Sequence, residues 1–243
     1  MPPLHFWPRL VAGVVDYLMA TVLAMAMIWP FLGLHDQLRL DVAGLMSVDC
    51  DTKARIPSIL RDQIGVQPYS YHDVCETSLL GRSNGKTATL VYGGLYRDGH
   101  PTPSQSIFVA VSDDFTPVTP LKPQTVITLL VLIFGGGLLI RRNGQTPGKR
   151  LVGLKVTGAS PVPGIAREAI KLLPCLLLAL ASLAWTFVGP PIPSNLWGLP
   201  WSTLAYAAVA LGLPLGWFYV LPILQWRGAL HHDRWLGLTV EQV

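Results

Sequence analysis

A short stretch between Asn143 and Val156, "NGQTPGKRLVGLKV", contains residues typical of phosphate binding. A loop that cradles nucleotide phosphates needs four residues between its first glycine and the Gly-Lys pair, followed by Ser or Thr as a magnesium ligand. Here three residues separate Gly144 from Gly148, and Lys149 is followed by Arg150. The spacing therefore argues against a nucleotide loop, and we interpret the stretch as a turn shaped by its glycines and proline.

Arg9 and Asp16 form a second pair of chemically informative residues. They are seven residues apart, nearly two helical turns, so both would project from one helix face about 10 Å apart along the axis. Asp16 lies inside an apolar stretch, where an acid costs a few kcal/mol unless it faces protein or water. Asp16 therefore either binds a cation, a proton or a polar group, or acts as a structural lock. Its candidate partners are Arg9, Arg167 and Lys171, the last two at i, i+4 spacing.

His231, His232 and Asp233 form a third group near the end of the chain. Three adjacent ligands cannot all point at one metal from a strand or helix, so no metal site is predicted. We expect Asp233 to pair with the basic Gly-Lys-Arg loop instead. Since the apolar blocks contain no Ser-His-Asp order, Cys-His pair or carboxylate pair, we expect neither an enzyme nor a cofactor.

The composition places these residues in a membrane protein. Hydrophobic residues make up 51% of the 243 residues and charged residues 13%, against about 25% charged in soluble domains. Four apolar blocks approach the length of a membrane span: Leu10–Leu34, Thr125–Ile140, Ala169–Gly189 and Ser202–Trp226. Because the first contains Asp16, we interpret it as a retained helix and not a signal peptide. The expected fold is an α-helical polytopic membrane protein with a four-helix transmembrane bundle, whose partner is the lipid bilayer and not nucleic acid.

Basic residues set the expected orientation. Seven Lys and Arg lie between Arg141 and Lys171, whereas the stretch between the third and fourth blocks has none. Positive residues stay cytoplasmic, so loop 141–168, tail 227–243 and both termini are expected in the cytoplasm of a bacterium, with the spans in its inner membrane. The expected organisation is residues 1–34 with the first helix, an extracytoplasmic insertion at 35–124, and residues 125–243 with the remaining helices.

The insertion differs in composition from the rest of the chain. It holds ten of the fourteen acidic residues. Six of its side chains are scattered and are interpreted as solvated and not catalytic: His72, Asp73, Asp98, His100, Asp113 and Asp114. "TATLVYGGLY" and "SQSIFVAVSD" alternate around a turn-rich segment, which predicts a β-hairpin, and "ARIPSILRDQIG" predicts a short helix. Cys50 and Cys75 are either a disulfide, which an oxidising exterior permits, or two unpaired thiols. We expect a small α+β insertion between the first two helices.

Two cytoplasmic stretches alternate in polarity, residues 152–156 and 236–240. Alternation with a period of two is typical of strands, and the two stretches are expected to pair beneath the helices. Lys149 and Arg150 would then anchor the turn to the inner leaflet or to Asp233.

Three segments resemble the RDD membrane proteins, a family named for one arginine and two aspartates. "PRLVAGVVDYLMA", with Arg9 and Asp16, looks like the family's opening, and "GQTPGKRLVGLKV" is similar to its loop after the second helix. "RGALHHDRWLGLTV" resembles its closing segment, although the usual Gly-Thr is here Gly237-Leu238-Thr239. The motif residues that the resemblance assigns are Gly144, Gln145, Pro147, Gly148, Lys149, Arg150, His232 and Asp233. It does not cover 35–124.

The resemblance implies transport of ions or small ligands, which has been proposed for this family. We therefore expect transport or exchange, with Asp16 as the intramembrane charge and Arg9 as its gate or partner. A homo-oligomer would help to enclose a path. The alternative is a non-enzymatic assembly or sensor protein whose insertion binds an extracytoplasmic protein partner.

Overall fold

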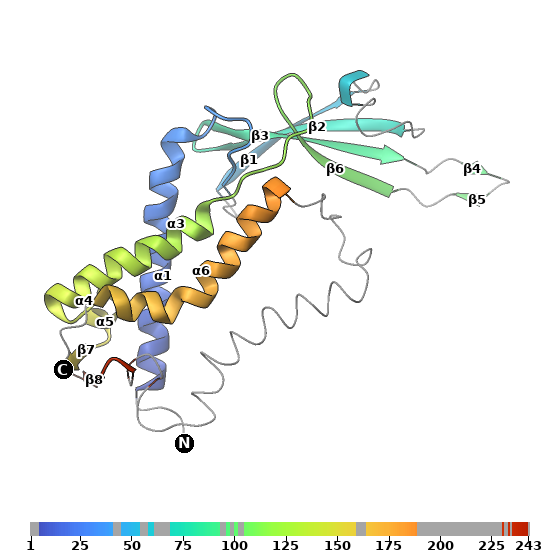
Figure 1. Cartoon of the computed structure of the whole chain (residues 1–243). Coiled ribbons are helices and arrows are strands. Elements are labelled where there is room, and N and C mark those ends of the chain that lie inside the picture. Colours follow the sequence, from blue (N-terminus) through green and yellow to red (C-terminus); the bar gives the residue numbers. More distant parts are fainter. Residues whose placement is uncertain are drawn as a thin grey trace. The chain divides into compact units, whose positions relative to one another are not determined.

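The structure is a computed structural model that describes residues 5–40, 45–53, 58–60, 69–92, 96–97, 100–101, 105–158, 164–188, 230, 233 and 235–242. The chain forms two compact units (Figure 1). The first unit contains residues 1–27, 124–182 and 197–243, and the second contains residues 28–123 and 183–196. Each unit is described separately below.

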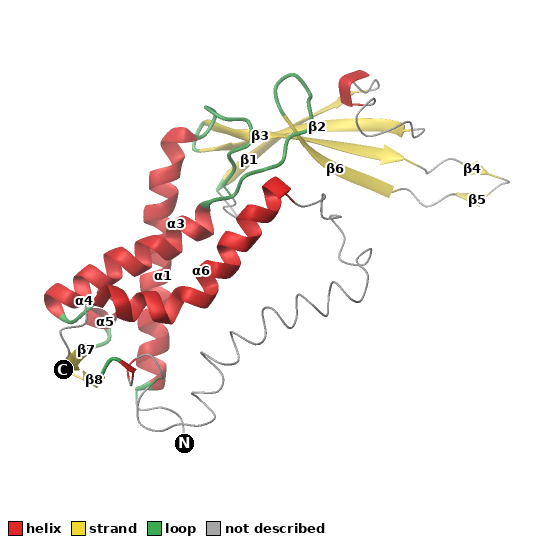
Figure 2. Ribbon diagram, in the orientation of Figure 1, coloured by secondary structure: helices red, strands yellow, loops and turns green. Residues whose placement is uncertain are grey.

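Long helical segments form much of the described part of the first unit and are coloured red in Figure 2. Helix α1 (Phe6–Ile28) continues into a 3-10 turn, η1 (Trp29–Phe31). The second segment is continuous over α3 (Gln124–Val131), the π-helical turn η2 (Leu132–Gly136) and α4 (Gly137–Asn143). The third is α6 (Gly164–Val188), with Pro174 inside it. An added Cβ at Gly137 would lie 2.4 Å from Ile165 Cα, so glycine at this position permits the close contact between α4 and α6.

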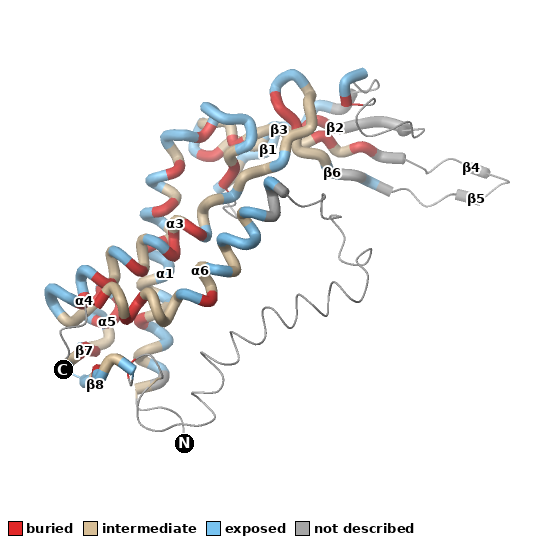
Figure 3. Tube along the Cα trace, in the orientation of Figure 1, coloured by how far each residue is buried: buried red, intermediate tan, exposed pale blue. Residues whose placement is uncertain are grey.

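Two helices are long and apolar enough to cross a membrane, Trp7–Phe31 with 25 residues and Gln124–Asn143 with 20. Within their most apolar windows, 22% and 33% of the residues are buried by protein. A helix from the core of a globular domain would be mostly buried. Exposed positions run along both helices (Figure 3).

The predicted four-helix transmembrane bundle is wrong. Two helices, not four, meet the criteria for a span in the described part of the chain, and the described fold is α+β, since it contains antiparallel sheets as well as helices. The third apolar block does form α6, but the first turns of that helix bring Arg167, Glu168 and Lys171 into protein contacts. An apolar run alone does not distinguish such a helix from a span. The fourth block, Ser202–Trp226, lies outside the described residues.

A four-stranded antiparallel sheet forms the second unit, in the order β1-β2-β3-β6. Its strands are β1 (Met46–Lys53), β2 (Tyr69–Leu79), β3 (Arg82–Tyr92) and β6 (Gln105–Val111). The pairing of β3 with β6 confirms the predicted hairpin, and β4 (Tyr96–Arg97) and β5 (His100–Pro101) pair between these strands in the sequence. Alternate residues of β3 are buried, so Ala88 and Leu90 join Leu60 and Val111 in the core. The expected short helix is described only at residues 58–60.

A disulfide between Cys50 and Cys75 joins β1 to β2, where the two residues are directly opposite. This confirms the disulfide and excludes the alternative of two unpaired thiols. The bond closes a loop with a sequence separation of 25 residues. By reducing the conformational entropy of the unfolded chain, a crosslink of this loop length stabilises the folded state by about 3 kcal/mol. The crosslink therefore stabilises a small sheet whose hydrophobic core is limited.

The start of the second unit is held to the β2–β3 hairpin by one tryptophan and one arginine. Trp29 Nε1 donates to the Leu79 carbonyl at 3.3 Å. The Arg82 guanidinium donates to the Pro30 carbonyl at 2.7 Å and lies 4.7 Å from the centre of the Trp29 ring. These contacts fix the chain after η1 against the sheet.

Two short strands of the first unit pair as predicted, β7 (Leu154–Gly158) with β8 (Leu238–Gln242). Val156 lies opposite Val240, and Val156 and Leu238 pack with Ile140 of α4. The predicted strand at 151–156 begins late, because residues Pro147–Leu151 instead form a short helix, α5. The β7–β8 pair therefore connects the end of the second helical segment, at α4, to the C-terminal tail.

Candidate functional site

Asp16 anchors the glycine-containing motif to α1. Its Oδ1 accepts a hydrogen bond from the Gly148 backbone N–H at 2.7 Å, and its Oδ2 accepts one from the Thr146 hydroxyl at 2.5 Å. Thr146 is also the N-cap of α5, accepting from the Lys149 backbone N–H at 3.4 Å, and Pro147 occupies the first helical turn. A carboxylate at the start of a helix is favourable because the first backbone N–H groups there have no partner within the helix. The motif is thus a capped turn docked onto α1.

Close packing at this docking point requires glycine. A Cβ at Gly148 would lie 2.1 Å from the Ala12 carbonyl oxygen and 2.9 Å from Asp16 Oδ1. The same motif also holds β7: the Gly144 carbonyl accepts from the Val156 N–H at 2.8 Å, and Gln145 donates to the Leu154 carbonyl at 3.0 Å. The predicted motif residues therefore act together as a junction between α1, α4 and β7.

Glu168 lies at the centre of a second set of contacts, with its side chain only 5% exposed. Its Oε1 accepts from Arg167 at 2.5 Å and lies 3.7 Å from the Lys149 ammonium. Its Oε2 accepts from the Lys171 ammonium at 3.4 Å. Sequence reasoning missed Glu168, although it lies in the helical stretch between Arg167 and Lys171 and its i, i+3 spacing to Lys171 is a detectable signal.

Asp233 links α6 to the start of α1. Its Oδ1 accepts from Arg167 Nε at 2.7 Å, and its Oδ2 lies 3.5 Å from an Arg9 terminal nitrogen. Asp233 is 1% exposed, so this is a buried pairing. Arg9, predicted as a partner of Asp16, therefore pairs with Asp233 across 224 positions of sequence.

Two expected pairings are corrected by these contacts. Asp233 was expected to bind the Gly-Lys-Arg loop, but Lys149 of that loop pairs with Glu168. Arg167 and Lys171, expected near Asp16, both pair with Glu168. His232 lies outside the described residues. The predictions identified most of the charged residues but assigned their partners incorrectly.

We call the residues joined in this way, together with Asp16, the charged cluster: Arg9, Asp16, Lys149, Arg167, Glu168, Lys171 and Asp233. Lys149 Nζ lies 3.3 Å from Thr146 Oγ1, which connects Glu168 to the Asp16 contacts. Removing each ion from water costs several kcal/mol, and pairing offsets this only when the geometry is good and the remaining hydrogen-bonding capacity is used. The stability of the cluster therefore depends on how well each buried charge is paired.

Burial lowers the pKa of Lys149 from its ordinary value to about 8, against the opposing attraction of Glu168. The positive charges of Lys171 and Arg167 lower it further. The cluster thus contains one cation that begins to lose its proton only slightly above neutral pH.

We expect folding stability to respond to this ammonium between about pH 8 and pH 10.4, the ordinary lysine value. In this window the unfolded chain binds more protons than the folded chain, so the contribution of Lys149 to stability rises with pH. The full contribution is about 3 kcal/mol. The measurement is the midpoint of a denaturing-detergent titration of the purified chain at pH 7 and pH 9.5. Lys149→Met should remove most of this increase of stability with pH. The control Lys155→Met, at an exposed position on β7, should keep it. An equal pH dependence of the wild type and both variants would contradict the expectation.

A cavity of about 260 Å³ opens beside the charged cluster. Its polar end contains Asp16, Thr146, Glu168 and Lys171, and its walls are apolar side chains of α1, of the segment around η2 and of α6. We call it the cluster cavity. A π-helical turn in its wall is notable because such turns occur frequently at functional sites.

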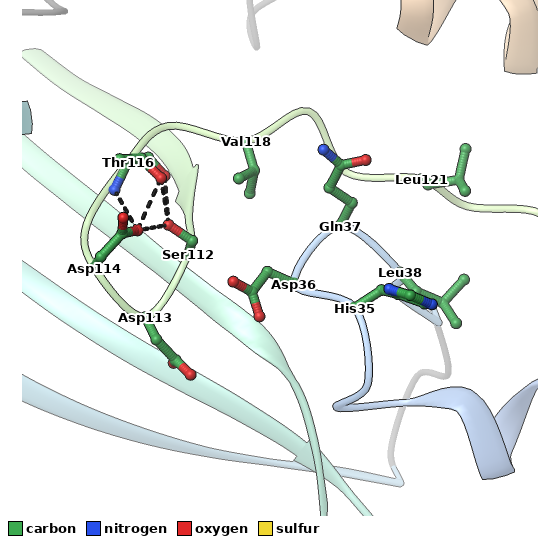
Figure 4. Close-up of a pocket in the computed structure, with 10 residues that line it drawn as sticks. All are labelled: His35, Asp36, Gln37, Leu38, Ser112, Asp113, Asp114, Thr116, Val118 and Leu121. Carbon is green, nitrogen blue, oxygen red and sulfur yellow. Dashed lines mark hydrogen bonds between the residues drawn. The ribbon is translucent and has the colours of Figure 1, made fainter.

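A larger cavity of about 680 Å³ lies in the second unit, between residues 35–38 and 112–121 (Figure 4). His35, Asp36, Asp113 and Asp114 line it, so the fold brings Asp113 and Asp114, which were interpreted as solvated, together with His35 and Asp36. Asp114 accepts from the hydroxyls of Ser112 and Thr116, and Asp113 pairs with Lys86 at 2.7 Å. Over the described residues, no group of three or more His, Cys, Asp or Glu side chains is arranged to hold a metal ion.

The charged cluster and its cavity are therefore the strongest candidate site, because they combine paired charges with a partly open cavity. Their chemistry is that of binding by charge and hydrogen bonds at the end of an apolar cavity. Comparisons with protein-family models, with curated proteins and with solved structures give no match to this chain.

Proposed function

We propose that the chain is a membrane protein of the RDD type that binds an ion or small ligand at the charged cluster and transports or exchanges it. The observation that carries the proposal is the position of the cluster: ionised side chains are enclosed where α1, an apolar helix with an exposed apolar surface, meets α5 and α6. Ionisable groups beside membrane segments are costly and mark ion or substrate paths more often than chance.

Membrane insertion accounts for the surface of α1. The described side chains that are more than half exposed include Trp7, Val14, Leu18, Val22, Leu23 and Met27. Soluble monomers rarely expose a contiguous apolar patch larger than a few hundred Å². Insertion of Trp7–Phe31 and Gln124–Asn143 would cover this surface with lipid and make the protein multi-pass.

The proposed orientation follows from connectivity and charge. Two spans place the segment between them on one side, and the Cys50–Cys75 disulfide fits an oxidising exterior. Arg141 and Arg142 end the second span and favour the cytoplasm. Since β8 pairs with β7, the tail would share that side, which supports two cytoplasmic termini in a bacterial inner membrane.

The RDD assignment is supported by the contacts of its three namesake residues. Arg9 lies 3.5 Å from Asp233, and Asp16 belongs to the same connected cluster through Thr146 and Lys149. Asp233 is thus a fitting second aspartate.

The test of transport is flux into liposomes that contain the purified full-length chain. Asp16→Asn keeps the size of the side chain but removes its charge, so we expect at least a tenfold loss of flux for the transported species. Asp49→Asn, an exposed position on β1, is the matched control and should leave flux unchanged. Flux equal to that of empty liposomes for H⁺, Na⁺, K⁺, chloride, small carboxylates and dodecanoate would refute transport.

The second candidate function is recognition of a protein partner by the second unit. Its 680 Å³ cavity supports this alternative, because pockets of this size suit small groups of a binding partner. Deleting residues 36–122 should abolish partner capture in this case and leave flux through the remaining chain.

A further inference from the structure

The cluster cavity has one charged end and an apolar body. Its charged lining groups differ in accessibility: the Lys171 side chain is 30% exposed, whereas that of Glu168 is 5% exposed. The walls include Leu23 of α1, Leu132 of η2 and Leu139 of α4. Among the charged side chains that line the cavity, Lys171 is therefore the ammonium, beside the carboxylates of Asp16 and Glu168.

Both carboxylates at the polar end already accept hydrogen bonds from protein groups. Asp16 accepts from the Gly148 N–H and the Thr146 hydroxyl, one at each oxygen. Glu168 accepts from Arg167 at Oε1 and from Lys171 at Oε2. A cation entering the cavity would have to compete with these donors, which makes the site poor for an additional positive charge.

The surrounding charge favours an anion. Lys149, Arg167 and Lys171 all lie within 4 Å of the single carboxylate of Glu168. The negative charge of Asp16 is met by the beginning of α5. Arg167 is shared with Asp233, so the whole charged cluster contains four cations and three carboxylates. Charged groups in a low-dielectric surrounding interact strongly, and the excess of one positive charge favours an anion.

The size and walls of the cavity select the rest of the ligand. A volume of about 260 Å³ corresponds to roughly nine waters at about 30 Å³ each, which is too small for a drug-sized molecule. Apolar walls exclude a fully hydrated ion. A small acidic group with a single apolar chain matches both ends.

We infer that the cluster cavity binds an anionic amphiphile, with a carboxylate or phosphate group at Lys171 and one apolar chain along Leu23, Leu132 and Leu139. This inference rests on the proposed function, since it names the ligand class of the same site. A free fatty acid and an acidic membrane lipid share this chemistry, and the experiment distinguishes them.

The experiment measures binding of radiolabelled dodecanoate to the full-length chain in phosphatidylcholine nanodiscs, with empty nanodiscs subtracted. We expect saturable binding that unlabelled dodecanoate displaces and dodecanol displaces at least tenfold less well. Lys171→Gln should weaken binding at least tenfold, and Lys171→Arg should restore most of it. Competition by a phosphatidic acid in the nanodisc, equal to or stronger than that of dodecanoate, would identify a lipid as the ligand; weaker competition would identify a free acid.

A matched pair of bulky variants tests the position of the chain. Leu139→Trp fills the cavity, since Leu139 lines it, and should abolish saturable binding. Leu138→Trp adds the same ring at an adjacent exposed residue and should leave binding intact. Equal binding by both variants, or displacement by dodecanoate and dodecanol alike, would overturn the inference. If the protein binds the ligand in this way but shows no flux, the ligand class stands and transport is refuted. If it transports another species and does not bind the ligand, only the ligand class is refuted.

Discussion

Replacing Gly148 by alanine should destabilise the chain by about 3 kcal/mol or more, the upper range for an overpacked site. The new Cβ would lie 2.1 Å from the Ala12 carbonyl oxygen, a backbone atom that no side-chain rotation can move. Relief requires α5 to move away from α1. This lengthens the hydrogen bond from the Gly148 N–H to Asp16 and leaves a carboxylate with fewer partners.

The measurement is the midpoint of thermal unfolding of the purified chain in a mild detergent, followed by circular dichroism. Gly136→Ala is the matched control, since its Cβ would meet nothing closer than 3.7 Å and its backbone is helical. This control should change stability by less than about 1 kcal/mol, the ordinary range for a surface or uncrowded site. A Gly148→Ala protein that unfolds with the wild-type midpoint would contradict the docking of α5 on α1.

Arg167→Met should have an effect of similar size, about 3–5 kcal/mol. Arg167 donates to Glu168 and to Asp233, both of which are almost fully buried. Methionine fills a similar volume but leaves both carboxylates without their strongest partner. Breaking a buried ion pair on one side is costly because the remaining charge keeps its desolvation penalty.

The matched control is Lys86→Met, which removes an ion pair with Asp113 whose side chain is 81% exposed. Exposed pairs contribute about 0–1 kcal/mol, so this variant should remain close to the wild type. Adding Glu168→Gln and Asp233→Asn to Arg167→Met should recover part of the loss, because the uncompensated charges are then gone. The interpretation fails if Arg167→Met and Lys86→Met are equally stable, or if the triple variant is less stable than the single one.

Several elements were predictable because their signals are local. The apolar runs of α1 and of Gln124–Asn143 were identified as spans, and both are long and apolar enough for that role. Alternation identified the β3–β6 hairpin and the β7–β8 pair, and two cysteines in one segment pointed to the disulfide. Each of these depends on periodicity or residue type within a short window, which tertiary contacts did not override.

The four-helix bundle was wrongly predicted because hydrophobicity measures how strongly a segment avoids water. It does not show whether the segment then contacts lipid or protein. Near the start of α6, Arg167, Glu168 and Lys171 lie within five residues and make protein contacts. Whether an apolar run meets lipid or protein is decided by its neighbours, which a window of sequence does not contain.

The sequence by itself determined which residues of this protein would be costly to bury. The tertiary structure alone decided which partners offset that cost. Arg9, Asp16, Lys149, Arg167 and Asp233 were identifiable because charge next to an apolar run is unfavourable without a partner. Their actual partners depended on contacts between residues as distant as 224 positions, the separation of Arg9 and Asp233. Charges act over a few ångströms in space, whatever their separation along the chain. The composition therefore indicates that an electrostatic site exists, and only the packing of α1, α5 and α6 assigns its pairs and opens the cavity beside them.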